Sequence, residues 1–256
     1  MWLQLSPWRD REASEVMVER AKAADFSGLC LTVDVPVGAK RERDLRNNLS
    51  LPFRVTARNA VDVASRPGWL PTAYYSMRKQ HGNHPTDPKD GGGAVSMAKW
   101  VTHTMNPSAT WDEVRWLRTI WPGHLLVKGV LRADDAQQAR DAGADAVVVS
   151  NHGGRQLDSA IASMRALPDV VATVGSEIDV LVDGGFRRGS DVVKAMALGA
   201  KACLIARPYV LSLALGDPGP RRILEIFRSE IDTTMALLGA RGWDEIDSSM
   251  IEVRRG

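Results

Sequence analysis

A histidine and an arginine three residues apart are the residues of this sequence best suited to acid–base chemistry. His152 and Arg155 lie in the stretch SNHGGRQLD (150–158), directly after the apolar run AVVV. Barrel enzymes place catalytic groups at the carboxyl ends of buried parallel strands. An imidazole can take a proton, while a guanidinium binds a carboxylate through two parallel hydrogen bonds. The pair therefore predicts proton transfer on a substrate that carries a carboxylate.

Two basic loops late in the chain predict an anion site. The stretch DGGFRRGS (183–190) joins an apolar run to a helix start, and ARP (206–208) ends the next apolar run. In barrels, the loops after the last two strands form a common phosphate site. Arg187 and Arg207 would supply fork-shaped donors to phosphate oxygens.

A lysine and an aspartate follow two further apolar runs. Lys128, in LVKGV, must find a charge partner, and it could be a Schiff-base nucleophile or a cation beside an anionic ring. Asp34, in LTVDVP, could orient a histidine and stabilise its protonated form. The run KRERD (40–44) is equally well read as a solvated face or as part of the site.

These groups need an α/β framework to position them. Near-continuous apolar runs predict parallel strands buried on both faces, at 2–5, 28–33, 125–130, 146–150, 179–182 and 202–206. Amphipathic patterns predict helices at 12–24, 134–142, 190–198 and 221–238. The alternation favours one domain over residues 1–256, with a long inserted loop at about 43–110 that has no strong period.

Composition excludes several function classes. The net charge of +2 and the absence of long charge blocks argue against nucleic acid, and no Cys/His cluster predicts a metal. The start of the sequence lacks a signal-peptide pattern, so we expect a cytoplasmic protein. The aromatic stretch PGWLPTAYYSM (67–77) favours local packing, although peripheral membrane contact through the 43–110 loop stays open.

Together these segments resemble the FMN-dependent 2-hydroxy acid dehydrogenase and oxidase family. SNHGGRQLD, LVKGV, DGGFRRGSD and LTVDVP stand in the family's order, and RERDLRN, WDEVRWLR and WPGHLLVKG look most like its mandelate and lactate dehydrogenase branches. The resemblance covers nearly all of the chain apart from about 60–95. It implies a (β/α)8 TIM barrel with FMN at its C-terminal face, which oxidises a small L-2-hydroxy acid (lactate- or mandelate-like) to the 2-oxo acid. It also implies a homo-oligomer, and it leaves open whether oxygen, a quinone or another carrier accepts the electrons.

The resemblance also implies a role for each site residue. His152 would take the proton lost from the substrate, with Asp34 hydrogen-bonded behind it, and Arg41 and Arg155 would bind the substrate carboxylate. Lys128 would lie at the flavin N1/O2 edge, where negative charge develops on reduction. The other implied FMN contacts are Gln4, Thr32 and Ser150 at the ring, Asp183 at the ribityl chain or nearby backbone, and Gly185, Arg187, Ala206 and Arg207 at the phosphate.

Three departures from the family pattern bear on function. Ser6 stands where the family has a substrate-binding tyrosine, and Ala206 stands where it has glycine. Only about six of the eight barrel strands are predicted, because the family has over a hundred further residues before Trp2. We therefore expect this chain alone to be unstable or to aggregate unless another polypeptide completes the sheet.

Other functions remain open at this point. One is a non-catalytic remnant of the family that cannot retain FMN. A Schiff-base aldolase would use Lys128 without a flavin. A different FMN barrel, such as a type 2 isopentenyl diphosphate isomerase, would not require the His152 and Arg155 pair.

Overall fold

The computed structural model describes residues 1–39, 41–47, 56–68 and 104–252. The chain divides into two compact units. The first unit consists of Met1–Leu5, Asp25–Asp34 and Ala109–Gly256, and the second of Ser6–Ala24 and Val35–Ser108. The single domain expected from the sequence stays a prediction.

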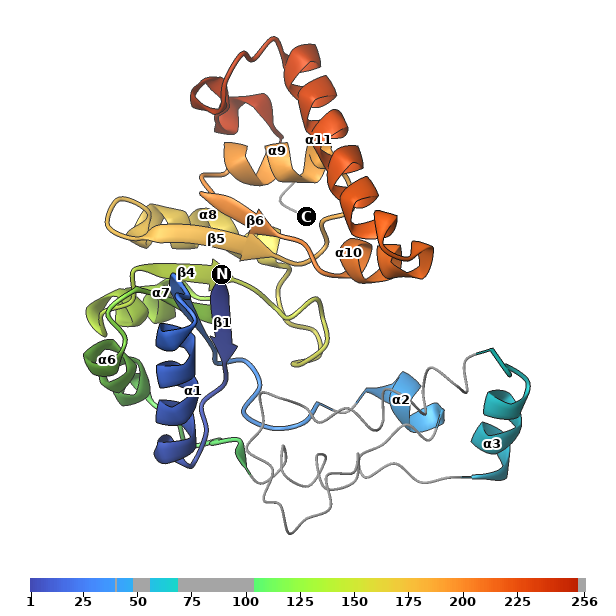
Figure 1. Ribbon diagram of the computed structural model, residues 1–256. Coiled ribbons are helices and arrows are strands. Elements are labelled where there is room, and N and C mark those ends of the chain that lie inside the picture. Colours follow the sequence, from blue (N-terminus) through green and yellow to red (C-terminus); the bar gives the residue numbers. More distant parts are fainter. Residues whose placement is uncertain (40, 48–55, 69–103, 253–256) are drawn as a thin grey trace. The chain divides into compact units, whose positions relative to one another are not determined.

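The first unit is built on a parallel sheet. Among the residues that the structure describes, its six strands are β1 (Trp2–Leu5), β2 (Gly28–Thr32), β3 (His124–Val130), β4 (Ala146–Val149), β5 (Asp179–Asp183) and β6 (Ala202–Leu204). They lie side by side in chain order, and every neighbouring pair is parallel. The sheet curls into part of a barrel (Figure 1). This order and curvature confirm the predicted partial (β/α)8 barrel.

Burial on both faces explains why the strands are continuously apolar. Every residue of β2 and β4 is buried. Side chains alternate between the two faces of a strand. The inner face carries the cluster Cys30, Leu126, Ala146, Val148 and Leu181, against which Leu204 packs. The alternate residues of the same strands face the covering helices.

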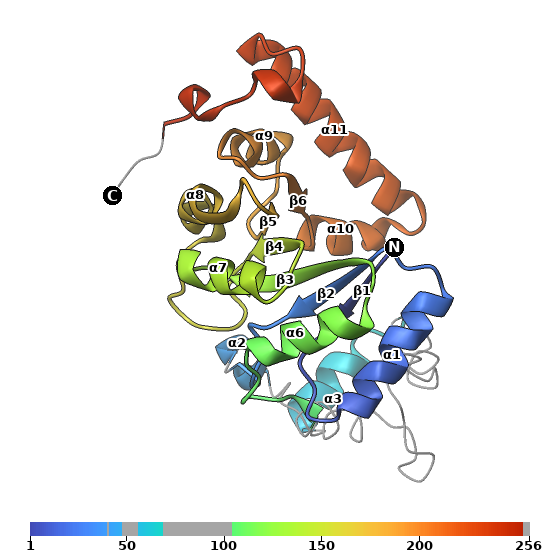
Figure 2. The ribbon, with the colours of Figure 1, turned by 90° about the vertical axis from the view of Figure 1, so that its left-hand side faces the viewer.

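Helices follow the strands of the first unit. They are α6 (Trp111–Ile120), α7 (Ala133–Asp141), α8 (Ser163–Val174), α9 (Gly189–Ala197), α10 (Arg207–Ser212) and α11 (Pro218–Leu238), and short 3-10 turns lie at Leu213–Leu215, Trp243–Glu245 and Ser248–Met250. Figure 2 shows α6, α7, α8 and α9 along the outer side of the sheet. The helices predicted at 134–142, 190–198 and 221–238 are confirmed to within three residues. Helices α6, α8 and α10 were not predicted.

Close packing joins the last helices of this unit. A methyl group on Gly189, the first residue of α9, would lie 2.5 Å from the backbone nitrogen of Ile231 in α11. Glu230 of α11 accepts hydrogen bonds from the Gly189 N–H at 2.7 Å and from Arg188 at 2.9 Å. The Gly189 N–H donor, followed by Arg188, lowers the pKa of the Glu230 carboxyl. This contact fixes the start of α9.

The second unit contains the predicted helix at 12–24, observed as α1 (Arg11–Ala23). It begins at Asp10, whose carboxylate accepts a hydrogen bond from the Ala13 N–H at 3.2 Å. Two short helices, α2 (Glu42–Arg46) and α3 (Ala57–Ala64), fall in or beside the region expected as an inserted loop. Most of the remainder of that region, including residues 69–77 of the aromatic stretch, lies outside the described residues. In the described parts of the chain, no helix combines the length and apolarity needed to cross a bilayer.

Candidate active site

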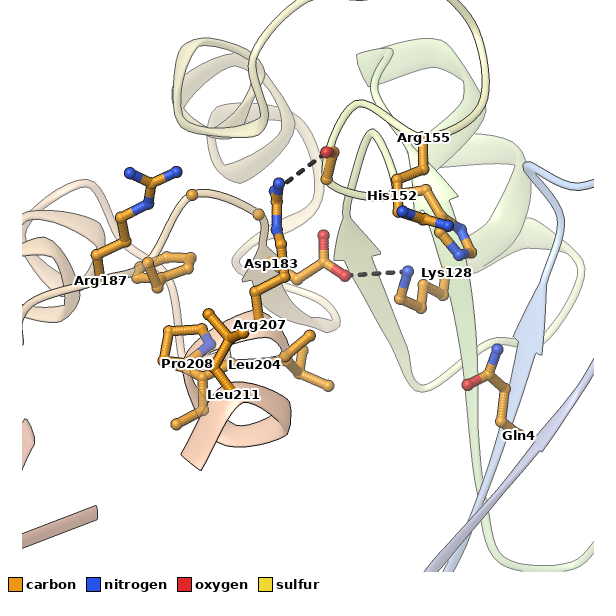
Figure 3. Close-up of a pocket in the computed structure, with 16 residues that line it drawn as sticks. Gln4, Lys128, His152, Arg155, Asp183, Arg187, Leu204, Arg207, Pro208 and Leu211 are labelled. Carbon is orange, nitrogen blue, oxygen red and sulfur yellow. Dashed lines mark hydrogen bonds and ion pairs between the residues drawn. The ribbon is translucent and has the colours of Figure 1, made fainter. Parts of the chain in front are cut away.

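A cavity of about 670 Å³ opens in the first unit at the carboxyl ends of the strands (Figure 3). This volume lies within the range of small-molecule and cofactor sites, which is about 300–1,000 Å³. Its lining contains most of the residues predicted from the sequence. The lining residues are Gln4, Lys128, His152, Gly153, Arg155, Asp183, Gly184, Gly185, Phe186, Arg187, Leu204, Ile205, Ala206, Arg207, Pro208 and Leu211.

The imidazole of His152 contacts the carboxylate of Asp34. Nδ1 lies 3.0 Å from Oδ1 and 3.2 Å from Oδ2 of Asp34, which follows β2. A carboxylate accepts a hydrogen bond from the Nδ1–H tautomer, and this leaves the lone pair on Nε2. The same carboxylate stabilises the imidazolium that forms when Nε2 takes a proton. The pair can therefore act as an oriented base.

A bulge in β3 makes room for this pair. The register between β3 and β4 shifts between Lys128 and Val130, and the intervening Gly129 has φ of +106°. A Cβ atom at Gly129 would lie 2.7 Å from the Cβ atom of Asp34. Because such a contact is too short for real atoms, the position of Asp34 depends on a glycine here.

The backbone of His152 is strained and held by its neighbours. Its φ of +56° lies in the left-handed region, which costs a non-glycine residue on the order of 1–3 kcal/mol. The Ser150 hydroxyl accepts a hydrogen bond from the His152 N–H at 3.0 Å. The Asn151 side chain accepts one from the Gly154 N–H at 3.2 Å, and the Asn151 N–H donates to the Ser163 hydroxyl at 3.2 Å. These bonds keep the loop in one conformation.

Lys128 has the charge partner that the sequence required. Its ammonium nitrogen lies 3.0 Å from Oδ2 of Asp183, the last residue of β5 (Figure 3), and 3.0 Å from the buried Ser150 hydroxyl. A Schiff-base nucleophile must be an uncharged amine, whereas an ion pair holds the side chain as a cation. The geometry favours the cation.

The predicted anion site lies at the other end of the cavity. Arg187 comes from the loop between β5 and α9, and Arg207 is the first residue of α10. Gly184 and Gly185 precede Arg187 with φ of +93° and +86°. Arg207 donates a hydrogen bond to the Gly153 carbonyl at 3.1 Å, in the loop that carries His152. Two guanidiniums and a glycine turn at a helix start suit a phosphate group.

Two buried side-chain oxygens have no hydrogen-bond partner within the described part of the chain. They are Oγ1 of Thr32, at the end of β2, and Oδ1 of Asp183. Buried polar atoms are satisfied in most proteins, so each of these oxygens is available to a ligand. Asp183 lines the cavity, and Thr32 pairs in register with Lys128 of the neighbouring strand.

Some of the other predicted site residues line the cavity, and some belong to the second unit. Gln4 of β1 and Arg155 line the cavity, with Arg155 drawn beside His152 in Figure 3. Arg41 belongs to the second unit, where it lies 3.7 Å from Asp44, and its role stays a prediction. Ser6, at the position of the family's tyrosine, belongs to the second unit as well.

Sequence reasoning missed the apolar part of the wall. Phe186, Leu204, Pro208 and Leu211 line the cavity. Phe186 and Pro208 stand inside the motifs DGGF and ARP, so their place beside the arginines was the available signal. The other members of those motifs, Gly185, Arg187, Ala206 and Arg207, were assigned to the phosphate, whereas Phe186 and Pro208 were given no role.

Neither cysteine has the character of a nucleophile. Burial raises the pKa of the Cys30 thiol to about 11, with the nearby Lys128 lowering it in part. Burial raises the pKa of the Cys203 thiol to about 12, although this residue is only partly buried. No group of three or more metal-ligating side chains gathers anywhere in the described ranges.

Comparisons with known proteins agree on one family. A model of the FMN-dependent dehydrogenase family matches residues 1–253. The chain is 41% identical over 253 residues to an L-lactate oxidase from Nostoc sp., and 40% identical over 254 residues to an L-lactate dehydrogenase from Caulobacter sp.. It superimposes on a crystal structure of the monotopic membrane protein (S)-mandelate dehydrogenase with a TM-score of 0.91 and 38% identity.

The matches cover the chain almost entirely and the relatives in part. They include 98% of this chain and 64% and 66% of the lactate oxidase and lactate dehydrogenase, and 99% of this chain and 67% of the mandelate dehydrogenase. The chain thus spans slightly less than two thirds of the length of these curated relatives. The cofactor of the family is FMN. The match over residues 1–253, the identities and the partial barrel together show that this chain belongs to the FMN-dependent dehydrogenase family.

Proposed function

We propose that this chain oxidises a small L-2-hydroxy acid to the corresponding 2-oxo acid with FMN. The observation that carries the proposal is a single cavity lined by the His152 base, which has Asp34 behind it, together with Arg155, Lys128, Arg187 and Arg207. Relatives named L-lactate oxidase, L-lactate dehydrogenase and (S)-mandelate dehydrogenase support the same reaction class. The substrate is therefore proposed to be lactate- or mandelate-like.

The residues present fit FMN. Arg187 and Arg207 would hold the phosphate, and the unpartnered Oδ1 of Asp183 would accept a hydrogen bond from a ribityl hydroxyl. Lys128 would face the N1 edge of the ring. The remaining contacts would come from Gln4, Thr32 and Ser150 at the ring, and from Gly185 and Ala206 at the phosphate. FMN, when bound, supplies the acceptor for the two electrons that leave the substrate.

The chain's own residues would bind the substrate and move its proton. Arg155, joined by Arg41, would hold the substrate carboxylate and so orient the carbon to be oxidised. Nε2 of His152 would take the proton that the substrate loses. Asp34 would stabilise the resulting imidazolium through Nδ1, from which it lies 3.0 Å.

The first test is the half-reaction. Because it needs no second electron acceptor, it can be followed without oxygen in purified protein supplied with FMN. We expect bound, yellow FMN that is bleached by L-lactate or L-mandelate and not by the D isomers. A protein that binds no FMN would instead support the alternative of a non-catalytic remnant.

The second test is His152→Gln. We expect the rate of FMN bleaching to fall about 10²- to 10⁴-fold while FMN stays bound, because the variant lacks the base. The control is His124→Gln, at the exposed start of β3 and outside the cavity lining. A His152→Gln rate close to that of the wild type would contradict the assignment of the base.

We also propose peripheral membrane contact through the 43–110 region. The support is the description of the mandelate dehydrogenase relative as a monotopic membrane protein. Co-sedimentation with anionic lipid vesicles tests the proposal, and a chain left in the supernatant at low salt would contradict it. The cytoplasmic location and the homo-oligomer expected from the sequence stay predictions.

A further inference from the structure

The contacts of Lys128 suggest a role for Asp183 that cofactor binding alone does not require. An ammonium group has three N–H donors. Within the described residues, two of them are directed to acceptors, Oδ2 of Asp183 and the Ser150 hydroxyl, each at 3.0 Å. These acceptors come from β5 and from the end of β4, so Lys128 of β3 reaches across two neighbouring strands. One donor direction is left for a ligand in the cavity.

The Lys128 and Asp183 pair is poorly exposed to solvent. The exposed fraction is 12% for the Lys128 side chain and 16% for the Asp183 side chain. Charges withdrawn from water are weakly screened, so each influences any third charge formed nearby. The second oxygen of Asp183 has no hydrogen-bond partner within the described part of the chain, and Lys128 is the cation that pairs with this carboxylate there.

We propose that Asp183 is a positioning residue that fixes the Lys128 ammonium and sets how strongly its charge acts on the bound cofactor. The inference rests on the proposed function, in which FMN occupies this cavity. Reduction adds negative charge at the N1 edge of the ring, which a cation favours and a carboxylate disfavours. The bound FMN thus faces an ion pair. Its reduction potential is therefore lower than it would be beside an unpaired ammonium and higher than it would be with no charged group nearby.

The test compares the two-electron reduction potential of bound FMN in four proteins: wild type, Asp183→Asn, Lys128→Met and the double variant. We expect Asp183→Asn to favour reduction about tenfold, which is roughly a 30 mV rise for a two-electron couple. Lys128→Met is expected to disfavour reduction at least about tenfold. The double variant should return to within about threefold of the wild type, because both charges are gone.

A merely structural role for Asp183 would weaken FMN binding without moving the potential. The dissociation constant of FMN is therefore measured by fluorescence quenching in the same proteins. The proposal would be overturned if Lys128→Met shifts the reduction potential while the equilibrium constant for FMN reduction in Asp183→Asn stays within about threefold of the wild-type value.

A second measurement needs no FMN. Removing one partner of a poorly exposed ion pair leaves a charge without compensation, whereas replacing both partners does not. In FMN-free protein, the thermal midpoint of the double variant should therefore exceed that of Lys128→Met. As a control, Arg140→Met and Glu177→Gln remove the more exposed ion pair between α7 and the turn that follows α8, which should show little coupling.

The outcomes separate this inference from the proposed function. A double variant no more stable than Lys128→Met would overturn the pairing, whatever the cofactor does. A wild-type protein that binds no FMN but shows the coupling would contradict the proposed function and leave the pairing supported. Bound FMN with an unmoved potential in Asp183→Asn would contradict the inference alone.

Discussion

Arg187 and Arg188 are adjacent in sequence but have different surroundings. Arg187 lines the cavity, whereas Arg188 pairs with Glu230 of α11 at 2.9 Å. We expect Arg187→Ala to raise the FMN dissociation constant roughly ten- to a hundredfold, because a charge-assisted hydrogen bond contributes about 1.5–3 kcal/mol. The substrate KM should change much less.

Arg188→Ala is the matched control for this prediction. It should leave the FMN dissociation constant unchanged and lower the thermal midpoint slightly, because the lost contact joins α9 to α11. Fluorescence titration with FMN measures both variants. Equal affinity in Arg187→Ala and wild type would remove Arg187 from the phosphate site.

Cys30 gives a prediction about pH. Its folded-state pKa of about 11 stands above the ordinary value of 9.0, so the folded protein favours the neutral thiol. The thiol should therefore contribute to stability fully below pH 9 and lose that contribution as the pH rises toward 11. At pH 8 the thiolate fraction is about a hundredfold lower than in the unfolded chain. Iodoacetamide should accordingly label folded Cys30 at least a hundredfold more slowly than the urea-unfolded protein, and equal rates would contradict the burial.

At the level of the elements, the bulge in β3 links strand geometry to the base. Gly129→Ala would place a methyl group against Asp34 and force a positive φ on alanine. We expect a loss of about 1–3 kcal/mol in the free energy of unfolding and a slower half-reaction, because Asp34 moves away from His152. The control is Gly38→Ala, where a new Cβ meets no atom within 4 Å. Equal unfolding curves for the two variants would show that the bulge tolerates a side chain.

The strands were the easiest elements to predict. Parallel strands covered on both faces are continuously apolar, so the runs that became β2 and β4 stand out in the sequence. The bounds of all six strands lie within two residues of the predicted ones. Helix α8 was missed because it contains Pro168 and follows a long glycine-containing loop, and α10 because six residues are too few to display a period.

The site residues that lie at the carboxyl ends of strands could be predicted from the sequence. Polar residues at those ends identified His152, Lys128 and Asp183 as neighbours of one cavity. The partner of Lys128 was not predictable, because the choice between Asp34 and Asp183 depends on how the side chains cross the sheet. The burial of Thr32 with no hydrogen-bond partner among the described residues is likewise a property of packing, and no local pattern encodes it.

At the scale of the whole molecule, the described sheet is open at both edges. In the described part of the chain, β1 and β6 each have one neighbouring strand, so each has a row of unpaired backbone groups. In the segment that follows β6 along the chain, Leu211 and Leu215 are 73% and 68% exposed. We therefore expect these 256 residues, when expressed alone, to form aggregates or assemblies at micromolar concentration.

Size-exclusion chromatography with light scattering checks this prediction across a concentration series. The apparent mass should rise with concentration and fall when mild denaturant weakens edge pairing. A single monomeric species that unfolds cooperatively at every concentration would contradict it.

The left-handed backbone of His152 has a consequence for attempts to engineer this protein. Asparagine and glycine adopt that conformation more readily than histidine does. Replacing His152 by either residue would relieve the strain at φ of +56° and also remove the base. A library screened only for heat resistance would therefore enrich inert proteins at this position, so selection for robustness has to be paired with selection for turnover.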